Sequence, residues 1–548
     1  MIVLPYYLIK NKIIQLVFNN DLSFNETIRF IERMLSISKE WTSQITLKLE
    51  YRLDLSSIGS QYPLKPILDW LDRHSLVYQL VNAKINTTHS HKYLQHQSRI
   101  IKGEVGYQYS IDLRSVHLEY PNLKQLLISQ TLVPSLEEFQ PNVDYSIEIT
   151  GQARILKTTQ LHILFGTDFF TRVGLVSTKI DYDIHQYTCE NRNGFNRISH
   201  LTLALDQPAM LIIDLIRCSR LLTKLELEIE TNRIYSVGYF EVILDTMSSL
   251  STTHLSLDYI YMVLYNAPFS RIITFLNSTT VSTVELKVFK YIHTEDHIPV
   301  HSYKIKNTKI SSFTFDNITI NSNEYSLLQC WEDTNNLKYL KFNSCDDIYS
   351  LSDRFKLPKI KEIKLCKYEG VNGSKYISFS TQIVKLMEIS INLQVIIVDN
   401  LPPKETIQLL SINRQLERLE IYFLDEPEPD SEVVDEDKEN LRVELLQNQI
   451  FQLLKYHQTL KTVRIQNVPI PINQINVIID ILDTNNTLIS LSLPKYLRGY
   501  CTTEQLDQFR KLLQHNHTIR YINILDQDTQ LISLFDQYLI KSKVPIKF

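Results

Sequence analysis

Glycine, paired cysteines and long apolar runs are scarce in this sequence, and each shortage argues against a class of protein. Only 11 of the 548 residues are glycine, which leaves few loops able to cradle a phosphate group. The 6 cysteines stand far apart without a Cys-x-x-Cys pair, so we expect neither a zinc site nor a disulfide framework, and a reducing compartment. No run of about 18 uncharged apolar residues occurs, and Lys10 and Lys12 interrupt the apolar start, so we expect neither a membrane span nor an export signal. The expected location is the cytoplasm or the nucleus.

Catalytic and metal-binding motifs are also missing. The sequence has no Gly-rich phosphate loop, no Gly-x-Ser-x-Gly and no His-Glu-x-x-His. His293 and His297 stand four residues apart with acids between them, but no third metal ligand accompanies them. We interpret His89, His91 and His96 as part of a polar surface loop. We therefore expect no catalytic activity, no metal and no cofactor.

The small net charge of -4 is unevenly distributed. The segment Asp425 to Asn440 (DEPEPDSEVVDEDKEN) holds nine acids and one lysine, a charge of -8, so the rest of the chain carries +4, the difference between -4 and -8. No large basic field remains, and we expect no nucleic-acid partner and no membrane partner. Because like charges repel, we interpret 425–440 as a solvated loop inserted before a helix that begins near Leu441.

The sequence does contain one short pattern that occurs twelve times. Each copy has apolar residues at positions 0, +3 and +5, as in Ile519, Ile522 and Ile524, except that one copy has a threonine at position 0. The intervals between copies run from 23 to 44 residues, a period typical of a solenoid. The copies begin at Ile198, Leu222, Thr252, Val281, Ile310, Leu337, Ile360, Leu393, Leu416, Leu460, Leu488 and Ile519.

Position +4 provides an independent check on this pattern, because in a strand it must face away from +3 and +5. Among the twelve +4 residues only Ile397 is apolar. We therefore expect each strand to have one buried apolar face and one solvent-facing polar face. Helical stretches between strands make the strands parallel and cover one face of the sheet. We expect these helices at Met210–Cys218, Thr381–Ile389, Lys404–Leu410, Val443–Tyr456, Gln474–Leu482 and Thr503–Leu513.

This pattern resembles the leucine-rich-repeat family, and the Asn-x-Thr sequence before Leu488 and Ile519 agrees with it. The family's Asn or Cys at +8 occurs only once, as Cys345, which favours the long variant with full helices. The resemblance implies an α/β leucine-rich-repeat solenoid, a horseshoe with a parallel sheet inside and helices outside, and a target protein on the concave face. The +4 row predicts a basic patch between acidic ones, the alternative being an ordinary solvated sheet face. The expected partner-binding residues are Glu285, Lys341, Lys364, Glu420 and Arg464.

Residues 1–45 read as a small α-helical unit unlike the rest. Leu-Pro near the start, an Ile-Ile pair, and the segment from Leu35 to Trp41 resemble an F-box, although the spacer around Asn19 to Thr27 is long and a residue is shifted before Ile37. The resemblance implies binding to a Skp1-type adaptor and the cullin ligase core. The alternative is a helical cap on the first repeat. The adaptor-binding residues would be Leu4, Pro5, Leu8, Ile13, Ile14, Leu35, Ile37 and Trp41.

We therefore expect an F-box-like unit at 1–45, degenerate repeats at 46–195, and leucine-rich repeats at 196–548 with the loop insertion 425–440 and a C-terminal cap at 526–548. Trp70 and Trp331 are expected in the core. In the degenerate region we expect strands at Ile45–Leu49, Leu113/Val116/Leu118, Leu123/Leu126/Ile128 and Leu161–Leu164, and a helix at Pro66–Leu80. Three functions fit: a substrate adaptor of a ubiquitin ligase, a leucine-rich-repeat binding scaffold, and a small-GTPase activator. The last is least favoured, because Arg464 is the only arginine in the +4 row.

Overall fold

The computed structural model divides the chain into two compact units. Unit 1 comprises Met1–Tyr235 and Thr252–Leu257, and unit 2 comprises Ser236–Ser251 and Asp258–Phe548. The structure describes residues 24–37, 46, 49–56, 64–85, 95–108, 112–130, 133–150, 155–176, 179–180, 197–204, 209–228, 237–250, 256–264, 267–288, 291–292, 303–317, 327–332, 336–343, 359–366, 390, 392–401, 403–423, 448–465, 475–492, 501–516, 518–523 and 529–538.

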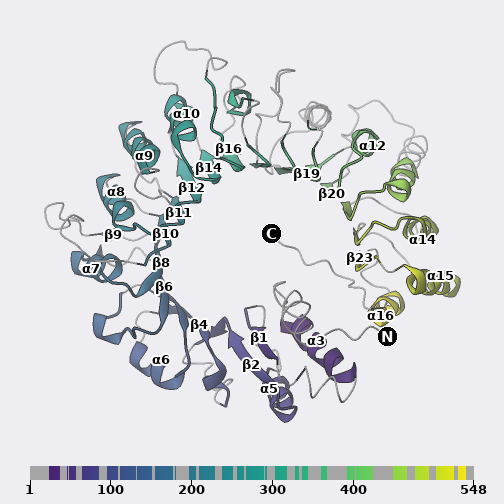
Figure 1. Cartoon of the computed structure of the whole chain (residues 1–548), viewed down its shortest axis with the longest axis horizontal. Coiled ribbons are helices and arrows are strands. Elements are labelled where there is room, and N and C mark those ends of the chain that lie inside the picture. Colours follow the sequence, from purple (N-terminus) through teal and green to yellow (C-terminus); the bar gives the residue numbers. More distant parts are fainter. Residues whose placement is uncertain are drawn as a thin grey trace, which may run out of the picture. The chain divides into compact units, whose positions relative to one another are not determined.

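Unit 1 alternates short strands with helices (Figure 1). Its elements are α3 (Phe24–Ile37), β1 (Glu50–Asp54), α5 (Leu64–Arg73), β2 (Val77–Val81), β3 (Ala83–Lys84), η4 (Gln97–Arg99), β4 (Lys102–Gln108), α6 (Leu113–Glu119), β5 (Gln125–Gln130), η5 (Leu136–Glu138), β6 (Asp144–Thr150), β7 (Ile155–Leu156), α7 (Thr158–Gly166), β8 (Phe170–Val176), β9 (Lys179–Ile180), β10 (His200–Ala204), α8 (Ala209–Cys218) and β11 (Lys224–Glu228).

The main sheet of unit 1 is parallel throughout, in the order β3-β4-β5-β6-β8-β10-β11. Strands β1 and β2 form a separate parallel pair, as do β7 and β9. Alternate residues of each strand are buried: Tyr145, Ile147 and Ile149 of β6 are at most 1% exposed. This alternation produces one face against the helices and one face toward solvent.

Unit 2 repeats the same plan along a longer sheet. Its elements are α9 (Val237–Leu250), β12 (Tyr259–Leu264), β13 (Ala267–Pro268), α10 (Phe269–Ser278), β14 (Thr283–Val288), β15 (Tyr291–Ile292), β16 (Ser312–Asn317), η8 (Leu327–Cys330), β17 (Tyr339–Asn343), β18 (Glu362–Cys366), β19 (Val395–Asn400), α12 (Pro403–Ile412), β20 (Arg418–Phe423), β21 (Thr462–Ile465), α14 (Ile475–Thr484), β22 (Ser490–Ser492), α15 (Thr503–His515), β23 (Tyr521–Asn523) and α16 (Thr529–Gln537). A further helix covers 448–456.

The sheet of unit 2 runs β12-β14-β16-β17-β18-β19-β20-β21-β22-β23, again wholly parallel. The predicted copies pair in register: Val284 lies opposite Phe313, and Phe313 opposite Leu340. Helices follow the strands on one side of the sheet (Figure 1). One parallel strand per repeat, with helices covering one face of the sheet, is the predicted α/β leucine-rich-repeat solenoid, and this fold class is confirmed.

One of the twelve copies was placed incorrectly. The strand expected from Thr252 is β12, in which Ile260 and Met262 are fully buried and lie opposite Val284 and Leu286. Position 0 of this copy is therefore five residues later, at 257 rather than 252. Leu255 and Leu257 have the same two-residue spacing as Ile260 and Met262 and come before them in the chain. Apolar spacing alone therefore selected the wrong pair.

Several predictions in 46–195 were wrong for a related reason. Leu113/Val116/Leu118 and Leu161–Leu164 lie in helices α6 and α7, and the helix predicted at Pro66–Leu80 ends at Arg73 and is followed by β2. A short apolar run with a three-residue step fits one helical turn as well as a strand. Leu123/Leu126/Ile128 is confirmed as β5. The strand predicted at Ile45–Leu49 is wrong at its described residues, because Thr46 and Leu49 lie outside any strand and β1 begins at Glu50.

Most of the predicted helices in the repeats are present. They correspond to α8, α12, the helix at 448–456, α14 and α15, with ends shifted by a few residues. The helix predicted at Thr381–Ile389 lies outside the described residues, as does the acidic segment 425–440. Trp331 is 6% exposed, as expected of a core residue, and Trp70 is half-buried.

Cysteine chemistry differs from the expectation. Cys218, at the end of α8, is disulfide-bonded, whereas Cys330 and Cys501 are buried and form no disulfide. The prediction of a sequence without disulfides is therefore wrong at Cys218. Wide spacing along the sequence does not prevent cysteines from meeting in a folded chain.

A ladder of polar side chains fixes the start of successive strands in unit 2. The Asn485 amide donates to the carbonyl oxygens of Leu454 and His457 at 2.8 and 2.9 Å, and its Oδ1 accepts from the N–H groups of Thr487 and Leu488. Asn307, Asn413 and Asn516 make equivalent contacts at their own strands. Each lies three residues before position 0, so this ladder is at -3 and not at the family's +8 position.

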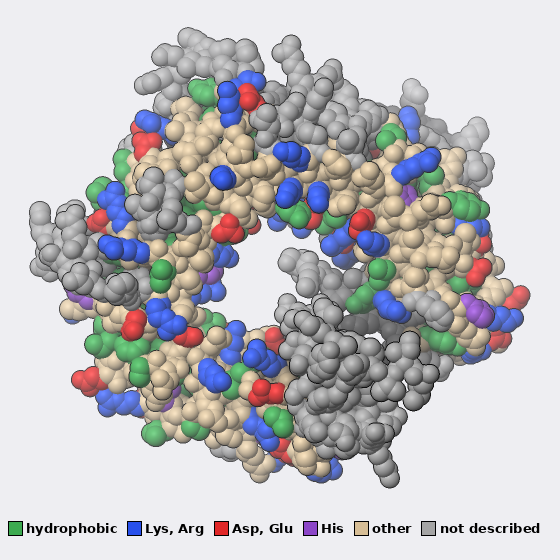
Figure 2. All heavy atoms as spheres, viewed as in Figure 1, with side chains coloured by type: hydrophobic (Ala, Val, Ile, Leu, Met, Phe, Trp, Pro, Cys, Tyr) green, Lys and Arg blue, Asp and Glu red, His purple; other side chains and the backbone are tan. Residues whose placement is uncertain are grey.

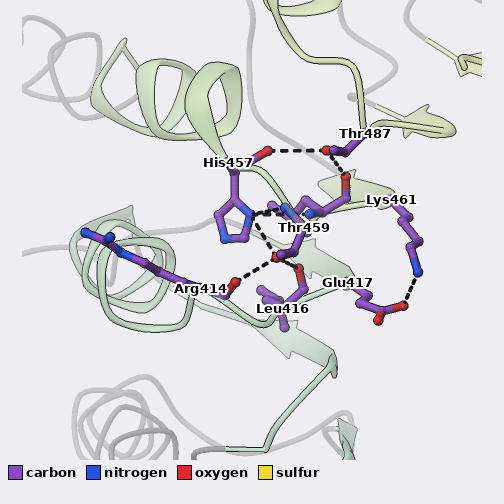
Figure 3. Close-up of polar contacts among 8 residues, drawn as sticks. Arg414, Leu416, Glu417, His457, Thr459, Lys461 and Thr487 are labelled. Carbon is purple, nitrogen blue, oxygen red and sulfur yellow. Dashed lines mark hydrogen bonds and ion pairs between the residues drawn. The ribbon is translucent and has the colours of Figure 1, made fainter.

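Histidine takes the asparagine's place in one rung of this ladder (Figure 3). Nδ1 of His457 lies 3.4 and 3.3 Å from the N–H nitrogens of Thr459 and Leu460, and Nε2 lies 3.1 Å from the carbonyl oxygen of Asn413. This arrangement requires a neutral ring that accepts at Nδ1 and donates at Nε2. Burial lowers the pKa of His457 from its usual 6.5, which favours that neutral form.

Candidate functional site

The predicted partner-binding residues all lie in unit 2, on one row of its sheet. Strand pairing aligns Glu285 with Thr314, Lys341, Lys364, Ile397, Glu420 and Arg464 in that order. This row is position +4 of seven successive strands, on the face opposite the buried +3 and +5 residues. The structure therefore brings the predicted residues together into one line.

Two lysines of this row are neighbours, and a further lysine immediately precedes each of their strands. Lys341 of β17 pairs with Lys364 of β18, so their Cα atoms are about 4.8 Å apart. Lys338 and Lys361 precede the same strands, and the N–H of Lys361 donates to the carbonyl oxygen of Lys338 at 2.8 Å. None of the four side chains forms an ion pair or side-chain hydrogen bond with any residue that the structure describes. We call these four residues the lysine face.

An exposed aromatic ring lies within the lysine face. Tyr339 of β17 is 44% exposed, unusually high for a large side chain in the middle of a sheet. It pairs with Glu362, the one acidic residue in the described parts of these two strands. Figure 2 shows Lys and Arg side chains grouped over the sheet between β16 and β19. Exposed tyrosine is enriched at protein-binding surfaces, because its ring supplies apolar area and its hydroxyl a polar contact.

The flanks of the row differ from the predicted acidic borders. Glu285 is half-buried on β14, two strands from Lys341. Glu420 is only 6% exposed, and its carboxylate accepts from the Arg418 guanidinium at 2.6 and 2.8 Å. A partner at that position would therefore meet Arg418, whose side chain is 46% exposed, more than Glu420. Arg464 is half-buried on β21, opposite Glu420.

Sequence reasoning missed three residues of this site. Lys338 and Lys361 occupy position +1 of their repeats, and Tyr339 occupies +2. Reading only the +4 row left them out, although the +1 residues of two successive copies are both lysine. The +1, +2 and +4 positions of successive copies together would have indicated the whole lysine face.

Most of the predicted adaptor-binding residues lie outside the described part of the chain. These are Leu4, Pro5, Leu8, Ile13, Ile14 and Trp41. Leu35 and Ile37 belong to the last turn of α3, and Leu35 is half-buried. Phe24, Ile28 and Ile31 of this helix are buried, and α3 packs near β1.

His96, which the sequence analysis assigned to a surface loop, is buried in the structure. His96 is 3% exposed, its Nδ1 lies 3.0 Å from the Tyr78 hydroxyl, and Asp69 and Asp72 approach its ring at 3.5 and 3.3 Å. Its assignment to a surface loop is therefore wrong. The other predicted histidines, 89, 91, 293 and 297, lie outside the described residues. Across the described residues, no group of three or more metal-binding side chains converges, and no helix is long and apolar enough to cross a membrane.

Comparison with known proteins gives structural likenesses only. The chain matches no protein-family model and no curated protein. An internalin from Listeria monocytogenes is 12% identical over 76% of this chain and 94% of that one, with a TM-score of 0.32. A leucine-rich-repeat protein of Leptospira interrogans is 12% identical over 81% of this chain and all of that one, with a TM-score of 0.25. The fold class stated above rests on strand pairing and register.

Proposed function

We propose that this chain is a protein-interaction protein whose lysine face binds an acidic segment of a partner. The observation that carries the proposal is the set of four lysines on β17 and β18 and at the positions immediately before them, none of which is neutralised by a described residue. Cations spaced by the sheet at about 4.8 Å can meet an extended acidic segment over several residues. Tyr339 supplies apolar contact area among them.

Charge reversal tests this proposal. In Lys341→Glu/Lys364→Glu, binding of a fluorescent ten-residue polyglutamate peptide at low salt should weaken at least 10-fold, measured by anisotropy, because attraction becomes repulsion. The matched control is Lys404→Glu/Lys511→Glu, which changes two exposed lysines on α12 and α15 by the same charge. Equal weakening in both double variants, or none in either, would reject the lysine face as the binding surface.

A second candidate function is a substrate adaptor of a ubiquitin ligase. It is supported by the F-box-like pattern of residues 1–45, and a helix is present where that pattern places its second one. In this function the N-terminal unit binds the Skp1-type adaptor and its cullin, and the lysine face selects the target. The alternative remains a helical cap on the first strands, which the packing of α3 near β1 fits equally well.

Capture of a purified Skp1-type adaptor separates these alternatives. Pro5→Ala/Leu8→Ala should abolish capture, because truncating buried interface side chains typically costs about 2–4 kcal/mol. Glu32→Ala, on the exposed side of α3, is the matched control and should retain capture. If the full-length chain never captures the adaptor, or does so without residues 1–45, the adaptor function fails. No described residue favours the small-GTPase role.

A further inference from the structure

A polar pocket of about 520 Å³ opens on unit 1, far along the chain from the lysine face. Strands β1, β2, β4, β5 and β6 contribute to its lining. Figure 2 shows Lys and Arg side chains beside acidic ones over the region of β1 and β4. Its volume falls within the range of about 300–1,000 Å³ that small-molecule sites occupy.

The backbone at Asn82 explains why a hollow forms here. Asn82 has φ of +56°, in the left-handed region, and it separates β2 from β3. The strand therefore bends, and β2 pairs along its length with β1 while it meets the segment before β4 only at the bridge between Leu80 and Ile100. The Asn82 amide donates to the Asp54 carboxylate at 3.0 Å and holds this bend.

Three cations line the pocket from three different elements. Arg52 is on β1, Lys102 on β4, and Lys124 immediately precedes β5. None of the three side chains forms an ion pair or hydrogen bond with any described residue. Arg52 and Lys124 are exposed, whereas Lys102 is half-buried.

The acidic residues nearby are already occupied. Glu50 accepts from the Gln79 amide, and Asp144 pairs with Arg197 at 3.1 Å. Asp54 accepts from Asn82 and from the N–H of Ser56 at 2.8 Å. These hydrogen bonds outweigh burial, and with the charge of Lys102 they hold the pKa of the Asp54 carboxyl below its usual range. These three carboxylates thus already have partners, and the three cations remain available to a ligand.

One acceptor in the pocket also lacks a donor. Oε1 of Gln79 is buried and forms no hydrogen bond. A buried acceptor without a partner costs about 1–3 kcal/mol, which a ligand N–H or O–H group would recover. Gln125 of β5 adds a further amide to the lining.

We propose that this pocket binds a compact, multiply charged oxyanion, a phosphate ester or a polycarboxylate, that also carries a hydroxyl group. The anionic group contacts Arg52, Lys102 and Lys124, and the hydroxyl donates to Gln79. Arginine holds planar or tetrahedral oxyanions through two parallel hydrogen bonds, and the lysines add point charge. This site lies in unit 1 and is independent of the proposed protein-binding surface in unit 2.

Calorimetric titration of the full-length protein tests the proposal. Glycerol phosphate and citrate are the two hydroxyl-bearing probes, inorganic phosphate tests the anion alone, and sodium chloride at equal ionic strength is the blank. Glycerol phosphate or citrate should bind more tightly than inorganic phosphate, and chloride should give no saturable signal. Preference for glycerol phosphate identifies a phosphate ester, and preference for citrate identifies a polycarboxylate.

Two variants and one control decide whether the pocket is responsible. Arg52→Gln/Lys124→Gln should weaken binding of the preferred probe at least 10-fold, and Gln125→Glu should weaken it by adding a negative charge. Lys65→Gln/Arg220→Gln removes two exposed cations of unit 1 elsewhere and should leave binding unchanged. Absence of saturable binding to every probe, or equal weakening in the control, would overturn the proposal.

Discussion

Asn485 and His457 perform the same task with different side chains. Each accepts N–H groups of the next strand start and donates to a carbonyl oxygen of the preceding repeat. The asparagine does so at any pH, whereas the imidazole does so only when neutral. His457 is 9% exposed, so a positive charge there would also be poorly solvated.

Replacing His457 by Asn should remove an acid sensitivity of unit 2. The pKa of His457 is lowered in the folded chain, so below about pH 6.5 the unfolded chain binds more protons and stability falls as the pH decreases. Above that pH the contribution is fully present. Urea unfolding at pH 7.5, 6.5 and 5.5 should show a shallower pH dependence for His457→Asn than for the wild-type chain.

The exposed His515 provides the control for this experiment. His515→Asn should leave the wild-type pH dependence unchanged. His457→Leu should lose about 1–3 kcal/mol even at pH 7.5, because the backbone groups at this rung lose their partner. Identical pH dependence in the wild type and His457→Asn would show that the ring does not control this transition.

At the scale of an element, β17 should separate the two faces of the sheet. Leu340 is 2% exposed and lies opposite Phe313 and Ile363, whereas Lys341 is half-buried on the other face. Leu340→Asp should cost more than about 4 kcal/mol, because it buries an unpaired carboxylate. Lys341→Asp should stay within about 1 kcal/mol of the wild type in urea unfolding followed by circular dichroism. Equal losses would contradict the assigned register.

The end of the sheet shows why the comparison belongs in β17. Ser492 is the +4 residue of β22, and the sequence predicts it to face water. In the structure it is 5% exposed, and Ser490 is 6% exposed. A charge at Ser492 would therefore be costly, and this position cannot serve as the tolerant control.

Sequence predicted the elements well where burial alone sets the pattern. In unit 2 the +3 and +5 positions must be apolar in every repeat, and the copies at Phe313 and Leu340 are aligned as expected. It failed where a short apolar run fits both a helical turn and a strand. Leu113 begins α6, and the signal that distinguishes it is the preceding Asp112, whose carboxylate accepts from the N–H of Arg114 at 3.1 Å.

The candidate sites were predictable to different degrees. Lys341 and Lys364 follow from strand periodicity, because +4 residues of adjacent repeats must be neighbours. The unit 1 pocket does not follow from any periodicity, since it depends on a backbone bend at Asn82 and on contacts between strands that are distant in sequence. No local pattern shows that the acids of this pocket are engaged while its cations are not.

For the whole molecule, two compact units predict two unfolding transitions. Repeat arrays are stabilised by contacts between neighbouring repeats, so distant parts need not unfold together. Trp70 reports on unit 1 and Trp331 on unit 2. Urea unfolding of Trp41→Phe/Trp331→Phe and of Trp41→Phe/Trp70→Phe, each of which keeps a single tryptophan, should give fluorescence midpoints that differ. Coincident midpoints in both variants and in circular dichroism would show one cooperative unit.

The acidic segment 425–440 should be dispensable for folding. It lies between the end of β20 at Phe423 and the helix at 448–456, and the free energy of loop closure depends only weakly on length. Deleting it should change the free energy of unfolding of unit 2 by less than about 1 kcal/mol in urea. A larger loss would mean that the segment contributes to the folded repeats.

Natural selection on the strand-start ladder acts on the hydrogen-bond acceptor atom, which more than one residue type can supply. Single-nucleotide changes connect the codons of asparagine with those of histidine, serine and threonine, and two residues before position 0 of another repeat the Thr279 hydroxyl accepts from the N–H of Val281. The amino-acid sequences of successive repeats can therefore diverge through folded intermediates, while the strand register stays the same. The outward side chains on β17 and β18 are then free to adapt, one at a time, to a new partner without any loss of the fold that carries them.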